Sequence, residues 1–306
     1  MLGVLTGFAI IAVVVGVGYL VSRLRLAGDG AEYALNRVAF FVAIPALLFH
    51  TLSRADVHVL LSGLLVVAVL SAAAAALVYL VVARLVLRLR FADTIIGALS
   101  ASYVNANNIG LPVAVYVLGD PSYVAPVLLF QLLIYAPAAL TVLDVSGGGG
   151  VSVGRVLSQP LRNPMIIAAL AGIVLAVTGW RPPEAVMEPF GLIGGAAVPM
   201  VLMAYGMSLH GAVPFRAGTG RREVLLASVL KVVLMPTVAW LLARYAFDFS
   251  GQALLATVIL AALPTAQNVY NFASRYERQV IVARDAVLVA SVAAVPAMVV
   301  ISALLA

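Results

Sequence analysis

Long apolar runs alternate with short polar gaps along the whole chain. A membrane-crossing helix needs about 20 mainly apolar residues, and the strict alternation typical of membrane barrel strands is sparse here. The pattern therefore predicts an all-α polytopic membrane protein with ten transmembrane helices. The predicted spans are residues 2–22, 33–52, 60–83, 94–119, 123–143, 163–180, 189–209, 223–245, 253–275 and 282–305.

The composition agrees with this prediction. Of the 306 residues, 64% are hydrophobic and only 10% are charged, whereas a soluble domain carries about a quarter charged residues. The chain contains no cysteine, which excludes disulfides, thiolate metal sites and thiol nucleophiles. The first run, MLGVLTGFAIIAVVVGVGYL, has no basic start and no small-residue cleavage site. We therefore interpret it as a first span rather than a removable signal peptide.

The distribution of arginines predicts the orientation. Fourteen arginines belong to the gaps after odd-numbered spans and three to the gaps after even-numbered spans. Since cytoplasmic loops carry an excess of Lys and Arg, we expect the odd-numbered gaps in the cytoplasm. Both termini then lie outside, in a multi-pass protein of the inner or plasma membrane. The net charge of +6 comes from these topology signals and forms no single basic face, so we expect no nucleic-acid partner.

The two halves of the chain resemble each other. The second and seventh spans contain VAIPALLF and AVPMVLMA, and the fourth and ninth contain NANNIGLP and LPTAQN. Each half holds five spans, an odd number, so similar halves must be inserted in opposite orientations. We therefore expect two inverted five-helix repeats, residues 1–145 and 161–306. A short cytoplasmic linker, residues 146–160, joins them and contains SGGGG.

The breaks in the fourth and ninth spans are the strongest functional signal. Proline removes a backbone donor and interrupts a helix, and interrupted helices at matching places in two repeats mark transporter binding sites. Half-helix N-termini would favour a carboxylate, and C-termini a cation. The structural alternative is two kinked helices joined by amide hydrogen bonds. The substrate-binding candidates are Asn105, Asn107, Asn108, Gly110 and Pro112, with Pro264, Gln267, Asn268 and Asn271.

Lys231 is a cation inside a span, nine residues beyond Arg222, which places it roughly 13 Å along the helix at 1.5 Å per residue. A lysine at this depth costs about 2.5–3.5 kcal/mol on insertion scales, so it should face the protein interior. We include Lys231 among the substrate-binding candidates as the countercharge of an anion. Three other roles stay open: a titrating group for proton coupling, a fixed cation in the place of Na⁺, and a structural lysine bonded to helix-end carbonyls.

Other residues carry weaker signals. Tyr205 and Gly206 are candidates for lining the cavity, although helix packing explains them equally well. His50 is interpreted as interfacial, and Asp285 as the partner of Arg284 in a surface ion pair. The sequence has no HExxH, no GxGD, no GxSG with a paired histidine and no P-loop. We therefore expect no enzyme activity, no cofactor and no metal.

Four stretches resemble the auxin efflux carrier family, the bacterial relatives of the plant PIN-formed auxin transporters. They are VAIPALLFHTL, NNIGLPVAVYVLG, LKVVLMPTVAW and ALPTAQNVYNFASRY, and together they extend the resemblance over nearly the whole chain. The resemblance implies a fold similar to that of sodium–bile acid symporters, with broken crossover helices 4 and 9. It also implies a scaffold of spans 1, 2, 6 and 7, a homodimer formed through scaffold spans 2 and 7, and a mobile transport domain of spans 3–5 and 8–10.

The cargo that the resemblance implies is a small organic anion, such as a carboxylate or an auxin-like acid. The expected function is secondary-active transport, in efflux or uptake, by elevator-like alternating access. Coupling to H⁺, to Na⁺ or to neither stays open, and a sodium-coupled symporter of the bile-acid type is the alternative. A membrane sensor without transport activity is disfavoured because no loop is long enough to form a signalling domain.

The absence of cysteine allows the topology to be tested by single-cysteine labelling. Gly148→Cys should react with a membrane-impermeant maleimide only from the cytoplasm, and Asp120→Cys only from outside, because the two residues belong to predicted loops on opposite sides. Labelling of intact cells and of inverted vesicles measures both. The reverse pattern would overturn the predicted orientation.

Overall fold

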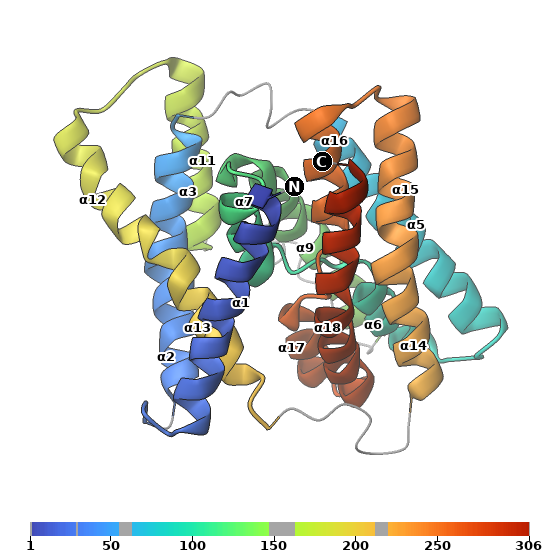
Figure 1. Cartoon of the computed structure of the whole chain (residues 1–306). Coiled ribbons are helices and arrows are strands. Elements are labelled where there is room, and N and C mark those ends of the chain that lie inside the picture. Colours follow the sequence, from blue (N-terminus) through green and yellow to red (C-terminus); the bar gives the residue numbers. More distant parts are fainter. Residues whose placement is uncertain (1, 29, 55–62, 147–162, 212–219, 306) are drawn as a thin grey trace.

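The computed structural model describes residues 2–28, 30–54, 63–146, 163–211 and 220–305, and all regular secondary structure in these ranges is helical (Figure 1). The elements are α1 Leu2–Arg23, α2 Ala31–Val38, η1 Ala39–Ala43, α3 Ile44–Leu52, α5 Gly63–Leu85, α6 Phe91–Ser102, η2 Ala106–Gly110, α7 Leu111–Tyr116, η3 Pro121–Val124, α8 Ala125–Phe130, η4 Gln131–Tyr135, α9 Ala136–Ser146, α11 Pro164–Thr178, α12 Glu184–Gly195, α13 Ala197–Ser208, α14 Arg221–Val229, η5 Leu230–Leu234, α15 Met235–Leu241, η6 Leu242–Ala246, α16 Gly251–Ala261, α17 Gln267–Tyr276 and α18 Val280–Leu305.

The described part of the chain is that of a polytopic membrane protein. Seven stretches are long and apolar enough to cross a membrane: Thr6–Arg23, Ala31–Leu52, Gly63–Leu85, Pro121–Ser146, Glu184–Ser208, Arg221–Ala246 and Val280–Leu305. The other three predicted spans contain shorter apolar helices, Phe91–Ser102, Pro164–Thr178 and Gly251–Ala261. The all-helical membrane class is thus confirmed, whereas the ten-span inverted repeat stays a prediction. Most of the predicted linker, residues 147–160, lies outside the described residues.

The seventh predicted span was placed wrongly at its start. The prediction begins this span at Pro189, whereas α12 begins at Glu184 and carries Pro189 in its interior. Helices in membrane proteins tolerate an internal proline because neighbouring groups satisfy the freed backbone carbonyl. A proline is therefore a weaker boundary signal here than in a soluble protein.

Wide helical turns precede four of the prolines. A proline lacks the backbone N–H and clashes with the carbonyl four residues earlier, and a turn widened to π-helical geometry relieves that conflict. Three of these turns carry the amide or cationic side chains of their spans: Asn107 and Asn108, Gln131, and Lys231. The four turns and the prolines that follow them are η1 with Pro45, η2 with Pro112, η4 with Pro137, and η5 with Pro236.

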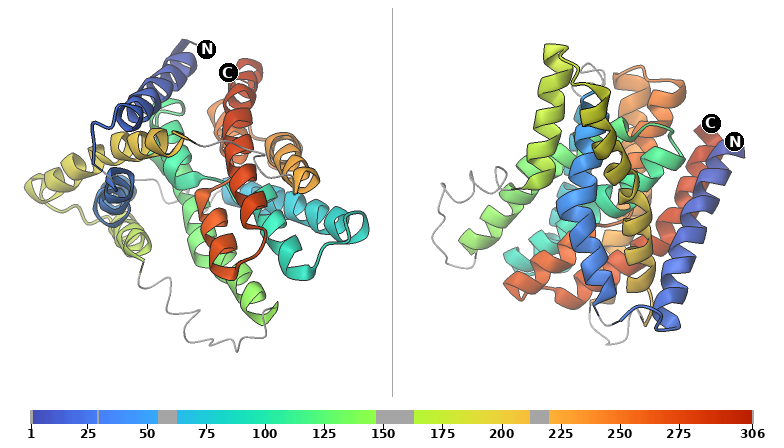
Figure 2. Two further views of the ribbon diagram at one scale, coloured as in Figure 1. Left: turned by 90° about the horizontal axis from the view of Figure 1, so that it is seen from below. Right: turned by 90° about the vertical axis from the view of Figure 1, so that its left-hand side faces the viewer.

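The helices pack in two groups that lie side by side (Figures 1 and 2). In the first group, at the left of Figure 1, α1 packs against α13, and α3 packs against α11 and α12. In the second group, at the right, α5 packs against α6 and α15, and α18 packs against α14, α16 and α17. The segments that interrupt the fourth and ninth predicted spans lie in the interior of this arrangement.

The helix connections at the two ends of the molecule differ in their arginine content. The connections α1–α2, α5–α6 and α17–α18 lie toward the lower end of Figure 1, and α11–α12 and η6–α16 at the upper end. The lower connections belong to the arginine-rich gaps of the sequence. The start of α1 and the end of α18 lie close together (Figure 2).

Glycines allow α1 and α13 to approach at the level of their backbones. A Cβ added at Gly18 would overlap the backbone of Met203, and one added at Gly206 would overlap the carbonyl oxygen of Val15. Small residues at such contacts are typical of helix packing in membranes. This geometry favours the packing explanation for Gly206.

Gly18→Ala and Gly16→Ala form a matched pair on α1. A Cβ at Gly18 meets the Met203 backbone, whereas one at Gly16 meets nothing within 4 Å. Gly18→Ala should lower the free energy of unfolding by about 1–3 kcal/mol through overpacking. Gly16→Ala should leave it unchanged or raise it by about 0.5–1 kcal/mol, because alanine has the higher helix propensity. Thermal unfolding in detergent measures both, and equal melting temperatures would contradict the packing argument.

Candidate functional site

The two breaks in the fourth and ninth predicted spans pair with each other. The Asn105 N–H donates to the Pro264 carbonyl at 2.8 Å, and the Ala266 N–H donates to the Tyr103 carbonyl at 3.0 Å. Val104 and Thr265, between these bonds, form an isolated antiparallel bridge. Each extended segment thus satisfies backbone groups that its partner loses by leaving the helix, as backbone buried at membrane depth requires. We call this paired segment, residues 103–105 with 264–266, the crossover.

Three buried side chains donate hydrogen bonds to carbonyl groups at, or just beyond, the C-terminal ends of the half-helices α6 and α16. The Thr265 hydroxyl donates to the Ser100 carbonyl at 2.6 Å. The Gln131 amide donates to the Val104 carbonyl at 3.0 Å, and the Lys231 ammonium donates to the Ala261 carbonyl at 2.9 Å. All three side chains are buried. This side of the crossover is therefore filled by the protein's own donors.

Lys231 lies against the end of α16. Its side chain is 0% exposed, and its Nζ lies 2.9 Å from the Ala261 carbonyl and 3.1 Å from the Met235 sulfur. A cation is stabilised there by the negative end of the helix dipole. Among the described residues the ion pairs are Arg54–Glu184 and Arg284–Asp285, so Lys231 belongs to neither. The contacts match the fixed-cation and structural alternatives more closely than a direct contact with an anion.

The N-terminal ends of the other two half-helices open onto a small cavity of about 50 Å³ beside the crossover. The turn η2 is capped by Asn105, whose Oδ1 accepts the Asn108 N–H at 3.0 Å. The helix α17 begins at Gln267 after Ala266, which provides no side-chain cap; among its first N–H groups, that of Val269 donates to the Ala266 carbonyl at 3.1 Å. The cavity's polar lining includes Tyr103, Asn105, Asn107, Asn108, Gln131, Gln267 and Asn268.

Two amide atoms in this cavity lining are buried without a hydrogen-bond partner in the described part of the chain. They are the Asn105 Nδ2 donor and the Asn107 Oδ1 acceptor, although the Asn107 Nδ2 donates to Asn108 Oδ1 at 2.8 Å. Asn105 is only 3% exposed. Leaving such an atom unsatisfied costs about 1–3 kcal/mol. Each such buried group requires a partner from outside the protein chain, such as a water molecule or a ligand.

Aromatic rings pack against Tyr103, which lines the cavity. Tyr103 stacks on Tyr135 with ring centroids 5.5 Å apart, and the edge of Phe272 lies 6.1 Å away. The Tyr135 hydroxyl forms a short hydrogen bond with the hydroxyl of Ser102. These contacts fix the side chain of Tyr103, whose hydroxyl also forms a hydrogen bond with the side chain of Asn268.

The remaining candidates have different positions. A Cβ at Gly110 would lie 2.9 Å from Leu263 and 3.0 Å from Val124, so this glycine keeps the two broken helices in contact. Pro112 and Pro264 are buried backbone elements of the breaks. Asn271 is exposed on α17 and is not among the residues that line the small cavity. Tyr205 lines a neighbouring cavity of about 290 Å³, which shares Gln267 with the small one.

Sequence reasoning missed two residues that donate hydrogen bonds at the crossover, one within it and one on η4. Gln131 is the one amide in the apolar stretch VLLFQLLIYAP, a signal that could have identified it as a buried hydrogen-bonding group. Thr265 lies between Pro264 and Ala266, and its role depends on a carbonyl 165 residues away in the sequence. No local pattern predicts that partner.

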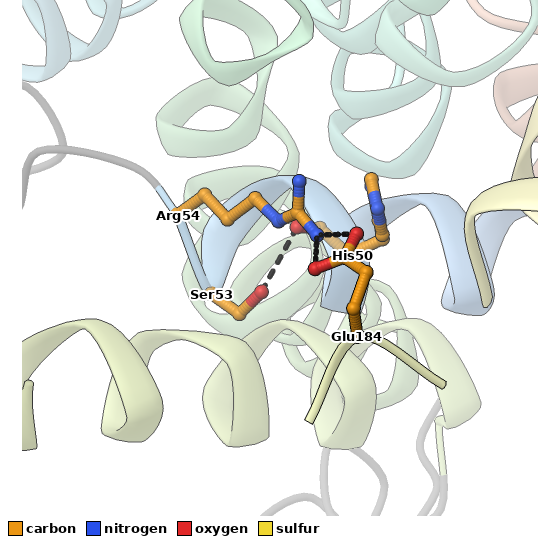
Figure 3. A network of polar contacts seen from close by, with 4 residues as sticks. All are labelled: His50, Ser53, Arg54 and Glu184. Atoms are coloured by element: carbon orange, nitrogen blue, oxygen red, sulfur yellow. Dashed lines mark hydrogen bonds and ion pairs between the residues drawn. The ribbon is translucent and has the colours of Figure 1, made fainter. Parts of the chain in front are cut away.

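Two weaker predictions are refined. Asp285 does pair with Arg284 at 2.7 Å, but its side chain is only 2% exposed, so the predicted surface pair is wrong for the carboxylate, which is buried by helix packing. His50 lies in the last turn of α3, where Ser53 donates to its carbonyl at 2.9 Å and Arg54 pairs with Glu184 at 2.8 Å (Figure 3). That network joins α3 to the start of α12 and contains none of the crossover residues.

Comparison with known proteins identifies transporters as relatives. The profile of a family described as "Membrane transport protein" matches residues 4–146 and 151–302. A protein of Methanothermobacter thermautotrophicus strain Delta H named "Uncharacterized transporter" is 28% identical over 265 residues, covering 84% of this chain and 83% of that protein. A protein of Rhizobium meliloti strain 1021 named "Putative malonate transporter" is 25% identical over 268 residues, covering 85% of this chain and 82% of that protein.

Thr265→Val tests the pairing of the two breaks. The substitution removes the donor to the buried Ser100 carbonyl and should lower the free energy of unfolding by about 1–3 kcal/mol. Thr257→Val is the control, because the Thr257 hydroxyl donates to Ala253, four residues earlier on the same helix. It should change the melting temperature little. A similar effect of both variants would refute a special role for the hydroxyl of Thr265.

Proposed function

Because this chain belongs to the membrane transport protein family, the auxin efflux carrier family, we propose that it carries a small organic anion by secondary-active transport. The observation that supports this proposal best is the set of hydrogen-bond donors at the N-terminal ends of the half-helices beside the crossover. The start of α17, which no side chain caps, meets the buried amide of Asn105 at one cavity, and the Asn105 Nδ2 donor has no partner among the described residues. Helix N-termini and free amide donors favour a carboxylate.

A carboxylate fits the small cavity, and the rest of an organic anion needs more space. A cavity of about 50 Å³ holds a group of a few heavy atoms, whereas typical ligand sites run from about 300 Å³ upward. The adjoining cavity of about 290 Å³ supplies that volume. In this proposal the carboxylate lies against Gln267 and Asn268 at the crossover, and the remainder of the anion extends toward Tyr205.

The two groups of helices suggest how the site moves. We assign the ten predicted spans to two inverted repeats, with spans 1, 2, 6 and 7 as a scaffold and spans 3–5 and 8–10 as a transport domain. The adjoining cavity is lined by α13 on one side and by α17 and α18 on the other. Elevator-like sliding of the second group would carry the crossover past α13 and expose it to the opposite side. This motion requires an intact crossover, because the backbone hydrogen bonds between the two breaks make them move together.

The scaffold also supports a homodimer in this proposal. Apolar side chains are exposed on the second and seventh predicted spans, among them Phe41, Val42 and Leu192. In a membrane such a surface faces either lipid or another protein chain. We assign it to a second copy of the chain, in the cell membrane, with both termini outside.

A sodium-coupled symporter is the alternative function. A cation would be expected at the C-terminal ends of the half-helices, but there the Lys231 ammonium already bonds the Ala261 carbonyl. This contact favours an anion carrier in which Lys231 stands where a coupling cation would otherwise bind.

Asn268→Ala and Asn271→Ala form a matched test of the site. Both asparagines are exposed on α17, but only Asn268 lines the small cavity. With malonate as the probe, Asn268→Ala should lower uptake into proteoliposomes about tenfold or more, the loss expected for a hydrogen bond to a charged group. Asn271→Ala should stay within about twofold of the unmodified protein.

Equal uptake by the two variants would argue against the crossover as the binding site. The same assay with external Na⁺ replaced by K⁺ separates the two functions, and unchanged uptake is the expected result. Uptake that requires Na⁺ would support the sodium-coupled symporter instead.

A further inference from the structure

The cavity of about 290 Å³ beside the crossover has a charged residue in its lining that the proposed function does not use. The polar residues around it are Tyr205 and Ser208 of α13, Gln267 and Tyr270 of α17, and Arg284 and Ser291 of α18. Among the described residues that line this cavity, Arg284 is the one with a charge. The cavity is lined by the last turn of α13, at the lower end of Figure 1, where the α17–α18 connection also lies.

Asp285 holds the guanidinium of Arg284 from one side. The Arg284 Nε donates to Asp285 Oδ1 at 2.8 Å, and Nη2 lies 2.7 Å from the same oxygen. The aspartate side chain is 2% exposed, whereas the arginine side chain is 42% exposed. The carboxylate is therefore the buried partner of the pair, and Arg284 Nη2 is buried beside it, whereas the arginine side chain as a whole is partly exposed and lines the cavity. Arg284 Nη1 carries two further N–H donors that Asp285 does not engage.

The pair also orients the arginine. A guanidinium presents its donors in a fixed planar fork that matches a carboxylate. Because Asp285 is buried and engages Nε and Nη2, it restricts the rotation of the fork and leaves the Nη1 donors unengaged by the carboxylate. Tyr205 and Ser208 of α13 line the same cavity.

We propose that this cavity is a carboxylate-binding access site, in which Arg284 binds the organic anion before it reaches the crossover. Gln267 lines both cavities and connects the two positions. The inference rests on the proposed function, since it assigns the route by which the same anion enters. Arg284 is a binding residue in this account, and Asp285 is a positioning residue that acts through it.

Kinetics of malonate uptake in proteoliposomes test the proposal. Arg284→Gln should raise the KM for malonate about tenfold or more, with little change in the maximal rate, because the crossover site is intact. Arg284→Lys keeps the charge but loses the planar guanidinium fork, so its KM should lie between those of the unmodified protein and of Arg284→Gln. Arg275→Gln is the control, since Arg275 is an exposed arginine of the last turn of α17 that does not line the cavity, and its KM should not change.

The double variant Arg284→Gln/Asp285→Asn separates binding from stability. Removing Arg284 alone leaves a buried carboxylate without this partner, which destabilises a protein by itself. If the anion binds Arg284, the double variant should have the same raised KM as the single one. Recovery of a normal KM in the double variant would show that Arg284 only neutralises Asp285, and would overturn the proposal. An unchanged KM in both variants would overturn it as well.

Labelling gives a second measurement that does not depend on transport. In the cysteine-free chain, Ser208→Cys should react with a water-soluble maleimide, and malonate should slow the reaction. Ser53→Cys, which lines a separate cavity with Arg54 and Glu184, should show no protection. Equal protection at both positions, or none at either, would overturn the assignment. Failure of these tests together with a low uptake by Asn268→Ala would leave the crossover site standing and remove only the access site.

Discussion

Backbone groups inside a membrane-spanning protein must find partners, and two short extended segments in this chain pair with each other. The hydrogen bonds of Asn105 with Pro264 and of Ala266 with Tyr103 satisfy groups that neither half of the chain could satisfy alone. The ends of α6, α7, α16 and α17 are positioned by this pairing. Every functional argument about the crossover depends on it, because it brings residues about 160 positions apart in the sequence into one cavity lining.

The pairing also separates two kinds of helix ends. On the C-terminal side, Thr265, Gln131 and Lys231 each donate to a carbonyl. On the N-terminal side, the amides of Asn105 and Asn107 line a cavity, and each has one atom without a partner among the described residues. The wide turns before prolines carry the side chains of Asn107, Asn108, Gln131 and Lys231. The turns that relieve the steric conflict of the prolines therefore also carry the polar groups.

Much of this architecture is predictable from the sequence because its causes are local. Span length, arginine distribution and the breaks at Pro112 and Pro264 are all readable from short windows, and the family resemblance is confirmed over both halves. The contacts of Lys231, Thr265 and Asp285 were not predictable, because each depends on a helix distant in sequence. The burial of Asp285 next to a half-exposed Arg284 shows the limit most clearly: adjacent residues on one helix face different environments.

The crossover is held together mainly by main-chain atoms. The four backbone groups that join Tyr103 and Asn105 to Pro264 and Ala266 are present whatever side chains occupy most positions around them. Amides such as Asn107, Asn108 and Asn268 can therefore be exchanged in evolution without dismantling the join itself. A lineage of such carriers could change its cargo by a few substitutions in η2 and the first turn of α17 while keeping the same moving parts.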